Sequence, residues 1–366
     1  MRRRRRAILA LVLLAVLMLR ASATREAAAQ AVESCAMVVF PSLFPFCVAC
    51  RYLTGSGALR FRRGDRWCCR MFGVPAAGLG ALAMGLCGGY PMGVQAACEL
   101  YRTGQLGREE TERFLRFGND TGPAIFFGMA GAVLFKNAAV CAALYGLHIL
   151  SALLTGLVLA PTDAPMPEPR RCAPEPAPET LPECISKSFF AVAGLCGYVI
   201  FFAVALRLVQ DLPLMRTLAA QMPVLSVLLA ALTDLPSGIS AMAGIGSPAA
   251  RFILCSGAVT WGGLCVHMQA RSLWQTAGLR VRGYLGAKLF QSLIAALLAF
   301  PAAWLLFGIR LPLWPAALPF AAIIFKKVIA FFAKMGYNEK KSRTEAQVCC
   351  FARSRNPAPT APARSK

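Results

Sequence analysis

The chain has 366 residues, of which 57% are hydrophobic and only 15% are charged, and its formal net charge is +22. So few polar residues cannot cover the surface of a soluble globule, so the composition excludes an ordinary soluble enzyme. Lys and Arg lie in short loops and at both ends, without a nucleic-acid-binding motif among them. We therefore predict a membrane protein that binds no nucleic acid and keeps its basic loops in the cytoplasm.

Long apolar runs recur along the chain, each with at most one ionisable group: 138–160, 188–206, 224–250, 252–270 and 289–309. Each run can cross roughly 30 Å of hydrocarbon as a helix. No strand-like alternation recurs, and in lipid only helices or closed barrels satisfy their backbone. We predict an all-α polytopic protein of the cell membrane, with about 8 transmembrane helices plus two re-entrant or broken helical hairpins.

The N-terminus has the layout of a secretory signal peptide, with Arg2–Arg6, an apolar stretch from Ala7 to Leu19, and then Ala21-Ser22-Ala23. Because the rest of the chain is itself membranous, we favour an uncleaved first transmembrane segment within residues 1–24. Cleavage is the alternative. Either outcome leaves the chain outside the membrane near residue 25.

Gly and Pro interrupt the apolar stretches that follow. In chain order, these are a span at 31–53 bent by Pro41 and Pro45, a stretch at 71–98 broken at Gly88–Gly93, a stretch at 113–135 broken at Gly118–Pro123, and an unbroken span at 138–160. Eight prolines between residues 161 and 182 then predict an extended linker.

The second half repeats this order. It has an unbroken span at 187–209, a stretch at 222–246 broken at Asp234–Gly238, a span at 251–274, and an unbroken span at 285–309. Pro91-Met92-Gly93 corresponds to Pro236-Ser237-Gly238. A last apolar segment, 311–335, is a transmembrane or interfacial helix, and residues 336–366 form a basic cytoplasmic tail.

Loop charge favours re-entrant hairpins over full crossings at 76–102 and 222–246. If both dip in and return, the loop Arg102–Arg116, the linker and the segment Arg271–Lys288 are all cytoplasmic. If both cross, the loop and the linker move outside, against the positive-inside rule. Each half then has three true spans, so the halves are expected to form an inverted repeat around a shared central site.

The breaks supply the candidate chemistry. Pro123 suits the first position of a half-helix whose N-terminus, with the side chains of Asn119, Asp120 and Thr121, offers ligands to a cation or polar solute. Asp120 and Asp234 are the only acidic residues well inside the core apolar stretches, where a carboxylate by default marks a pathway or ion site. The alternative is that they cap half-helices or pair with a loop Arg. The candidate binding residues are Gly88, Gly89, Tyr90, Pro91, Gly93, Asn119, Asp120, Thr121, Gly122, Pro123, Asp234, Pro236, Ser237 and Gly238.

Other polar residues are weaker candidates. His148 is expected to be a hydrogen-bonded packing residue rather than a proton relay, and whether His267, with Gln269 and Thr260, lines a cavity stays open. The fifteen cysteines lie mostly in apolar runs or as adjacent pairs, so we expect no metal, disulfide or cofactor. No nucleophile elbow, HExxH, P-loop or dinucleotide fingerprint occurs, and we do not expect an enzyme.

Three segments, Phe40–Phe46, Met84–Gly93 and Phe117–Gly128, resemble the YlbJ family of sporulation integral membrane proteins, and the similarity extends over about residues 30–310. That family belongs to the nucleoside-recognition, or Gate-domain, group. The resemblance implies a first Gate-like repeat at 28–160, a cytoplasmic linker at 161–186, a second repeat at 187–310, and a role in spore formation. The stretch Gly257–Thr260 lacks the polar pair of Asn119-Asp120, which argues against a symmetric two-sided site.

Two functions follow as hypotheses. The first is a transporter-like protein that binds or moves a small polar solute, with a coupling cation, and takes part in sporulation. The alternative is a membrane scaffold for spore or envelope assembly that transports nothing. The solute and the oligomeric state stay open, a homo-oligomer included.

Overall fold

The computed structural model describes residues 2–55, 64–161 and 179–308, and these residues form helices and loops without a strand. The all-α prediction is confirmed for this part of the chain. Most of the predicted linker, the segment 311–335 and the basic tail at 336–366 lie outside the described residues.

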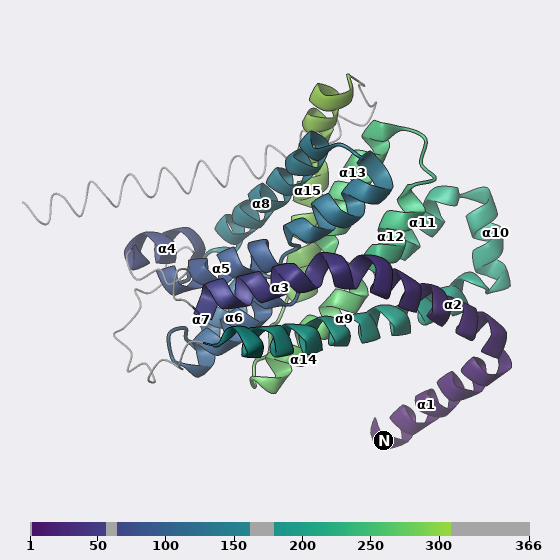
Figure 1. Ribbon diagram of the computed structural model, residues 1–366, viewed down its shortest axis with the longest axis horizontal. Helices are drawn as coiled ribbons and strands as arrows, with labels where there is room; N and C mark the ends of the chain where they lie inside the picture. Colours follow the sequence, from purple (N-terminus) through teal and green to yellow (C-terminus); the bar gives the residue numbers. More distant parts are fainter. Residues whose placement is uncertain (1, 56–63, 162–178, 309–366) are drawn as a thin grey trace, which may run out of the picture. The chain divides into compact units, whose positions relative to one another are not determined.

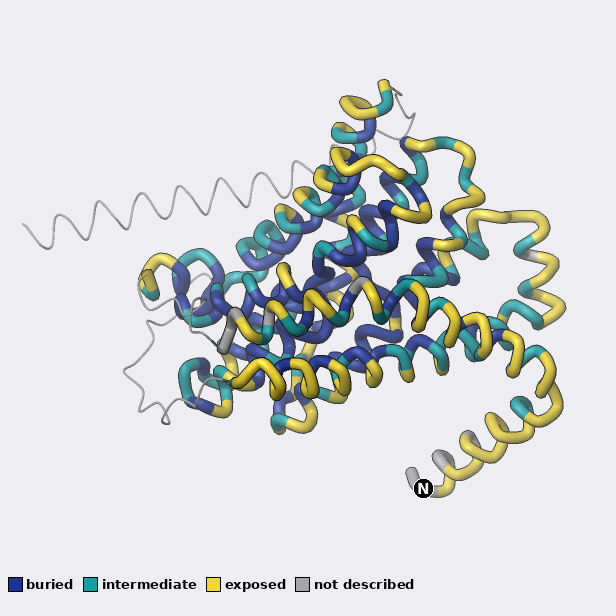
Figure 2. Tube along the Cα trace, viewed as in Figure 1, coloured by how far each residue is buried: buried dark blue, intermediate teal, exposed yellow. Residues whose placement is uncertain are grey.

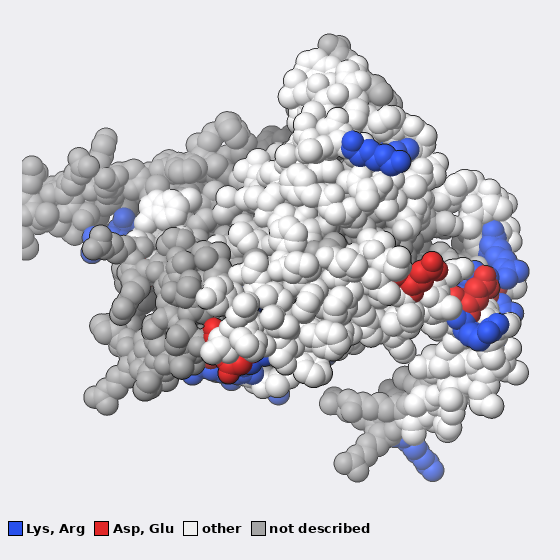
Figure 3. Space-filling model, in the orientation of Figure 1, with Lys and Arg blue, Asp and Glu red and all other residues white. Residues whose placement is uncertain are grey.

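Four helical segments in the described ranges are long and apolar enough to cross a membrane, or up to six if each of two bent pairs counts as one span. They are α8 (Ala138–Leu159), α9 (Leu181–Gln210), α13 with α14 (together Pro248–Thr276) and α15 (Tyr284–Phe307). All four coincide with predicted spans. On the face drawn in Figure 3, charged side chains are confined to a few small groups on an otherwise uncharged surface, as expected of a helical membrane protein.

The N-terminal helices are α1 (Arg2–Leu19), α2 (Ala21–Ser34), the π-helical turn η1 (Cys35–Val39) and α3 (Phe40–Gly55). The chain bends by 48° between Val39 and Leu43, beside Pro41, so the predicted bend is confirmed. The apolar part of α1 is Ala10–Leu19, shorter than the roughly 20 residues that cross a bilayer. Figure 2 shows α1 exposed along most of its length.

The first hairpin consists of α5 (Ala76–Gly88) and α6 (Met92–Arg102), preceded by α4 (Asp65–Phe72). The two helices pack against each other so closely that a Cβ at Gly85 would lie 3.2 Å from the Cα of Gly93. Gly89 makes the turn with a φ of +72°, which glycine adopts at no steric cost. The chain therefore folds back at the predicted break.

The predicted break at Gly118–Pro123 is also present. After α7 (Arg108–Phe114), residues 118–122 are irregular, and the π-helix η2 (Ala124–Phe135) follows Pro123 directly. A half-helix thus begins where the sequence predicts one. Asn137 then caps α8, because its side chain accepts from the backbone N–H of Ala139 and Val140.

In the second half, α9 is followed by α10 (Pro213–Gln221), the hairpin of α11 (Pro223–Thr233) and α12 (Leu235–Met242), α13 (Pro248–Trp261), α14 (Gly263–Thr276) and α15. A Cβ at Gly238 would lie 2.5 Å from the Cα of Ala231, so α11 and α12 fold back on each other. The predicted span at 251–274 is interrupted, because Gly262 and Gly263 have φ of +85° and +84°. The sequence pattern did not predict this break.

Helix α9 also begins earlier than the predicted start at residue 187. Thr180 and Glu183 form a capping box in which the Thr180 N–H donates to Glu183 Oε2 at 2.8 Å. The end of the predicted linker is therefore helical.

Both halves thus contain the same order of elements: a helix, a hairpin, a broken helix and a long helix. The helices that precede the two hairpins, α3 and α9, pack against each other, as do the long helices α8 and α15 (Figure 1). The buried residues gather where these elements meet the two breaks (Figure 2). The fold therefore brings the interruptions of both halves to its interior.

Candidate functional site

Asn119, Asp120 and Thr121 are completely buried, and their side chains contact the second half of the chain. The Asn119 Nδ2 donates to Tyr284 Oη at 2.7 Å, and the Thr121 Oγ1 donates to the carbonyl oxygen of Val259 at 2.7 Å. In the described chain none of the three side chains caps η2. The break therefore serves to join the two halves rather than to cap a helix.

Asp120 pairs with a lysine that is buried with it. The Lys288 Nζ lies 3.4 Å from Asp120 Oδ1, and both side chains are 0% exposed. Gln291 Nε2 donates to the same carboxylate oxygen at 2.9 Å. Lys288 also donates to the Asn119 carbonyl oxygen at 2.7 Å and to Gln291 Oε1 at 2.6 Å.

The position of Lys288 corrects the sequence analysis, which placed it in a cytoplasmic loop. It lies one turn inside α15, on the face shared with Tyr284 and Gln291. Spacings of four and three residues put these three side chains on one side of a helix. This periodicity at the start of an apolar helix was the signal that would have identified them.

His148 on α8 is held by both ring nitrogens. The Thr121 backbone N–H donates to Nε2 at 3.1 Å, so Nε2 carries no proton and the ring proton lies on Nδ1. Nδ1 lies 3.0 Å from Thr260 Oγ1, to which it donates. His148 therefore ties α8 to the break in the first half and to the end of α13.

We define the polar cluster as Asn119, Asp120, Thr121, His148, Tyr284, Lys288 and Gln291. Two buried acceptors of this cluster have no hydrogen-bond partner among the described residues. They are Asn119 Oδ1 and Asp120 Oδ2. A buried polar atom without a partner costs about 1–3 kcal/mol, so such atoms are uncommon unless they serve a ligand, ion or water. The cluster thus has the capacity to bind one more donor or cation.

The tips of the two hairpins meet two interruptions of the helices, the first break at residues 118–122 and the second break at Gly262–Gly263. A Cβ at Gly122 would lie 2.7 Å from the Gly89 nitrogen, so the first tip touches the first break. A Cβ at Gly263 would lie 3.1 Å from the Cα of Asp234, so the second tip touches the second break. Tyr90 joins the halves, since its hydroxyl lies 2.6 Å from the Cβ position of Gly262.

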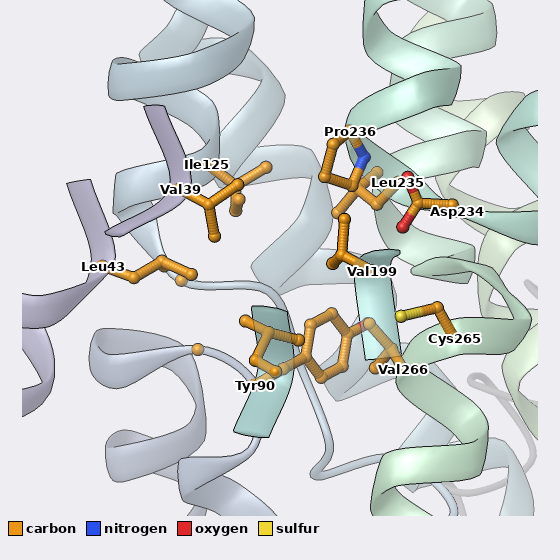
Figure 4. Close-up of a pocket in the computed structure, with 13 residues that line it drawn as sticks. Val39, Leu43, Tyr90, Ile125, Val199, Asp234, Leu235, Pro236, Cys265 and Val266 are labelled. Atoms are coloured by element: carbon orange, nitrogen blue, oxygen red, sulfur yellow. The ribbon is translucent and has the colours of Figure 1, made fainter. Parts of the chain in front are cut away.

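A cavity of about 30 Å³ lies between these tips. Its walls include the candidate residues Gly89, Tyr90, Gly122, Asp234 and Pro236. Figure 4 shows the apolar side chains Val39, Leu43 and Ile125 on one side and Asp234, Cys265 and Val266 on the other. Such a volume holds about two water molecules.

The other candidate residues have structural positions. Ser237 donates through its backbone N–H and its hydroxyl to Asp234 Oδ2, at 3.0 and 2.8 Å, so Asp234 caps α12. The remaining candidates support the two turns and the half-helix: Gly88, Pro91, Gly93, Pro123 and Gly238. No hydrogen bond joins Asp234 to the polar cluster within the described residues. The candidates therefore form two neighbouring groups, one around Asp120 and one around the cavity.

Within the described ranges, no three His, Cys, Asp or Glu side chains come together as metal ligands.

Comparison with known proteins gives one similarity to report. No family model matches the chain, and no solved structure matches it. Over 124 residues the chain is 36% identical to the sporulation integral membrane protein YlbJ of Bacillus subtilis (strain 168). The matched part covers 33% of this chain and 30% of that relative. Together with the apolar helices, this similarity supports a multi-pass integral membrane protein.

Proposed function

We propose that the chain is a permease or channel of the cell membrane that binds and moves a small polar solute, with the polar cluster and the adjoining cavity as its path. One observation carries the proposal: a charged pair, Asp120 and Lys288, is completely buried where both halves of an apolar helical protein meet. Charged side chains inside a membrane protein are costly, and they mark solute and ion pathways by default.

The backbone supports the same proposal. Irregular backbone at membrane depth is tolerated only where it is buried in protein or lines a watery cavity. Here the loop at 118–122 and the turn at Gly262–Gly263 each abut a hairpin tip. A protein that needed only an anchor would have no use for four such interruptions in one place.

We further propose that the halves form an inverted repeat of the Gate-like kind. The order of elements is the same in both, and contacts of α3 with α9 and of α8 with α15 fit a pseudo-twofold axis that passes between the members of each pair. With basic loops and the C-terminal tail in the cytoplasm, the re-entrant hairpins approach the centre from opposite faces. The tight cavity then corresponds to a closed form that opens when the hairpins move apart.

A coupling cation fits the polar cluster. Asp120 Oδ2 and Asn119 Oδ1 are free acceptors, while Lys288 already neutralises Asp120 from the other side. A proton that binds Asp120 removes the negative charge that attracts Lys288, and a bound metal cation would in addition repel Lys288. Such competition gives a physical means to couple ion binding to movement of α15 against the break.

The test is solute uptake by proteoliposomes, across a panel of polar metabolites, with wild type, Asp120→Asn and Glu109→Gln. Glu109 is an exposed acid on α7 and serves as the matched control. We expect at least one solute to accumulate in a saturable manner, Asp120→Asn to lower uptake about tenfold or more, and Glu109→Gln to behave as wild type. An unaltered rate in Asp120→Asn, or no solute taken up at all, would contradict the proposal.

The name of the relative suggests that this chain also serves spore formation, which we include in the proposal. The small cavity favours a second candidate, a membrane scaffold for spore or envelope assembly without transport. In a spore-forming host, a scaffold would tolerate the paired change of Asp120→Asn with Lys288→Met, which leaves no buried charge unpaired, and would lose function on removal of residues 336–366. A permease would show the opposite pattern.

A further inference from the structure

A second, larger cleft lies between the end of α14 and the start of α15. Its volume is about 600 Å³, within the range of about 300–1,000 Å³ typical of sites for small organic ligands. The polar cluster lies directly behind it, because Tyr284 lines the cleft and also accepts the hydrogen bond from Asn119.

The lining of this cleft is basic. The residues that line it include Arg271, Arg280 and Arg282, all three of which are exposed. No acidic residue lines the cleft within the described part of the chain. None of these guanidinium groups makes an ion pair with another described residue. One carboxylate lies beside the cleft, that of Glu112, whose Oε1 accepts from the backbone N–H of Arg280 at 3.1 Å. The three guanidinium groups of the cleft are therefore not engaged in ion pairs with the described residues.

The start of α15 adds a second source of positive potential. This helix has 24 residues, its N-cap Gly283 supplies no side-chain acceptor, and Tyr284, Leu285 and Gly286 of its first turn line the cleft. The first backbone N–H groups of a helix have no partner within it, and the helix dipole places partial positive charge there. Such helix ends bind phosphate and other anions.

A histidine that lines the cleft, His267, has one buried ring nitrogen without a hydrogen-bond partner among the described residues. His267 is only 4% exposed, its Nδ1 lies 3.2 Å from Tyr284 Oη, and its Nε2 has no hydrogen-bond partner among the described residues. Trp274, also buried, stacks edge-on against Tyr284 with ring centroids 4.7 Å apart. A ligand seated in the cleft would thus lie against this histidine and change the surroundings of one tryptophan.

From these features we infer that the α14–α15 cleft binds a phosphate-bearing anion, held by the three arginines and the N-terminus of α15, with His267 at its floor. The anion is either a soluble phosphate compound or the headgroup of an anionic phospholipid, since Leu264, Met268 and Leu285 expose apolar surface at the same cleft. The inference concerns binding alone and holds whether or not the chain transports a solute.

The test uses the full chain purified in detergent and titrated with inorganic phosphate, with thermal unfolding and tryptophan fluorescence as readouts. We expect saturable stabilisation that Arg271→Gln, Arg280→Gln and Arg282→Gln together weaken about tenfold or more. The matched control removes three exposed arginines that do not line the cleft, Arg4→Gln, Arg25→Gln and Arg66→Gln, and should bind as wild type. Trp274→Phe should remove the fluorescence change.

A second arm replaces phosphate with vesicles of phosphatidylcholine, with or without phosphatidylglycerol. Stabilisation by phosphatidylglycerol that depends on the three cleft arginines identifies a lipid headgroup, and stabilisation by inorganic phosphate identifies a soluble ligand; either result supports the inference. If the glutamine variant does not fold, the three Arg→Lys changes keep the charge but lose the planar fork and should weaken binding by a smaller factor. The inference is overturned if neither phosphate nor phosphatidylglycerol stabilises the wild type. It is also overturned if the probe stabilises the cleft triple variant and the control triple variant to the same extent.

Discussion

Lys288 on α15 lies 3.4 Å from Asp120 in the first break, and neither side chain reaches the surface. The two residues are 168 positions apart and belong to opposite halves of the chain. Each neutralises a charge that the other could not bury alone. The pair therefore joins the halves, and its removal one charge at a time is expected to behave differently from its removal as a whole.

Asp120→Asn or Lys288→Met alone should destabilise the protein by about 3–5 kcal/mol, because each leaves one buried charge unpaired. The double change removes both charges and should cost much less than the sum of the single changes. Thermal or denaturant unfolding in detergent measures this coupling. Additive effects would mean that the two side chains do not neutralise each other.

Gly122→Ala tests the contact between the first hairpin tip and the first break. The new methyl group would lie 2.7 Å from the Gly89 nitrogen, so backbone must move, at a cost of about 1–3 kcal/mol. Gly146→Ala on α8 is the control, since nothing lies within 4 Å of its Cβ position. That change should be neutral or stabilising by up to about 1 kcal/mol through helix propensity. Equal melting temperatures for the two variants would rule out the close contact.

His148 gives a test of the assigned tautomer. His148→Phe leaves the Thr121 N–H without its acceptor and should cost about 1–3 kcal/mol. His148→Gln keeps an acceptor oxygen on a side chain of similar reach and should recover part of that loss. If Phe were tolerated as well as Gln, the hydrogen bond from Thr121 would contribute nothing to stability. The comparison of the two unfolding curves decides between these outcomes.

Asp211, between α9 and α10, is surrounded by Arg20, Arg207 and Arg216 at 3.3, 3.4 and 2.9 Å. A charged group of this kind is visible where α2, α9 and α10 meet (Figure 3). The hydrogen bond from Arg216, followed by the charges of Arg207 and Arg20, lowers the pKa of the Asp211 carboxyl below its usual 3.8. Because the pKa is lower in the folded protein, this stabilisation is complete above pH 3.8 and is lost as pH falls through the lowered pKa.

Asp211→Asn should therefore lower the melting temperature by a constant amount from about pH 8 to about pH 5, and the difference should shrink in more acidic buffer. Glu26→Gln is the control, because Glu26 lies 4.0 Å from Arg207 and both are exposed. Exposed pairs of this kind contribute about 0–1 kcal/mol, so little change is expected at any pH. A difference between wild type and Asp211→Asn that grows on acidification would contradict the assignment.

The sequence predicted the hairpin at Gly89 and the half-helix at Pro123 because Gly and Pro act locally on the backbone. It missed the break at Gly262–Gly263, where no proline follows and the flanking residues suit a helix. It also missed Lys288, since a lysine near the start of an apolar run, directly after a basic loop, resembles a loop residue. Only the packing of α15 against the first break shows that its charge is buried.

Local sequence patterns could not predict which distant residues are paired in the folded chain. Asp120 was identifiable as an acid in an apolar stretch, but its partners Lys288 and Gln291 lie in the other half of the chain. Asp234 was identifiable in the same way, and in the structure it caps α12 through Ser237. Two acids with the same sequence signal thus have different surroundings.

The most direct test of the central claim is solute uptake by the double variant Asp120→Asn with Lys288→Met, which is expected to fold. If the polar cluster is the solute path, proteoliposomes with wild type accumulate a polar solute and those with the double variant do not, although both proteins unfold at similar temperatures. Uptake by the folded double variant at the wild-type rate would show that the buried pair serves architecture alone.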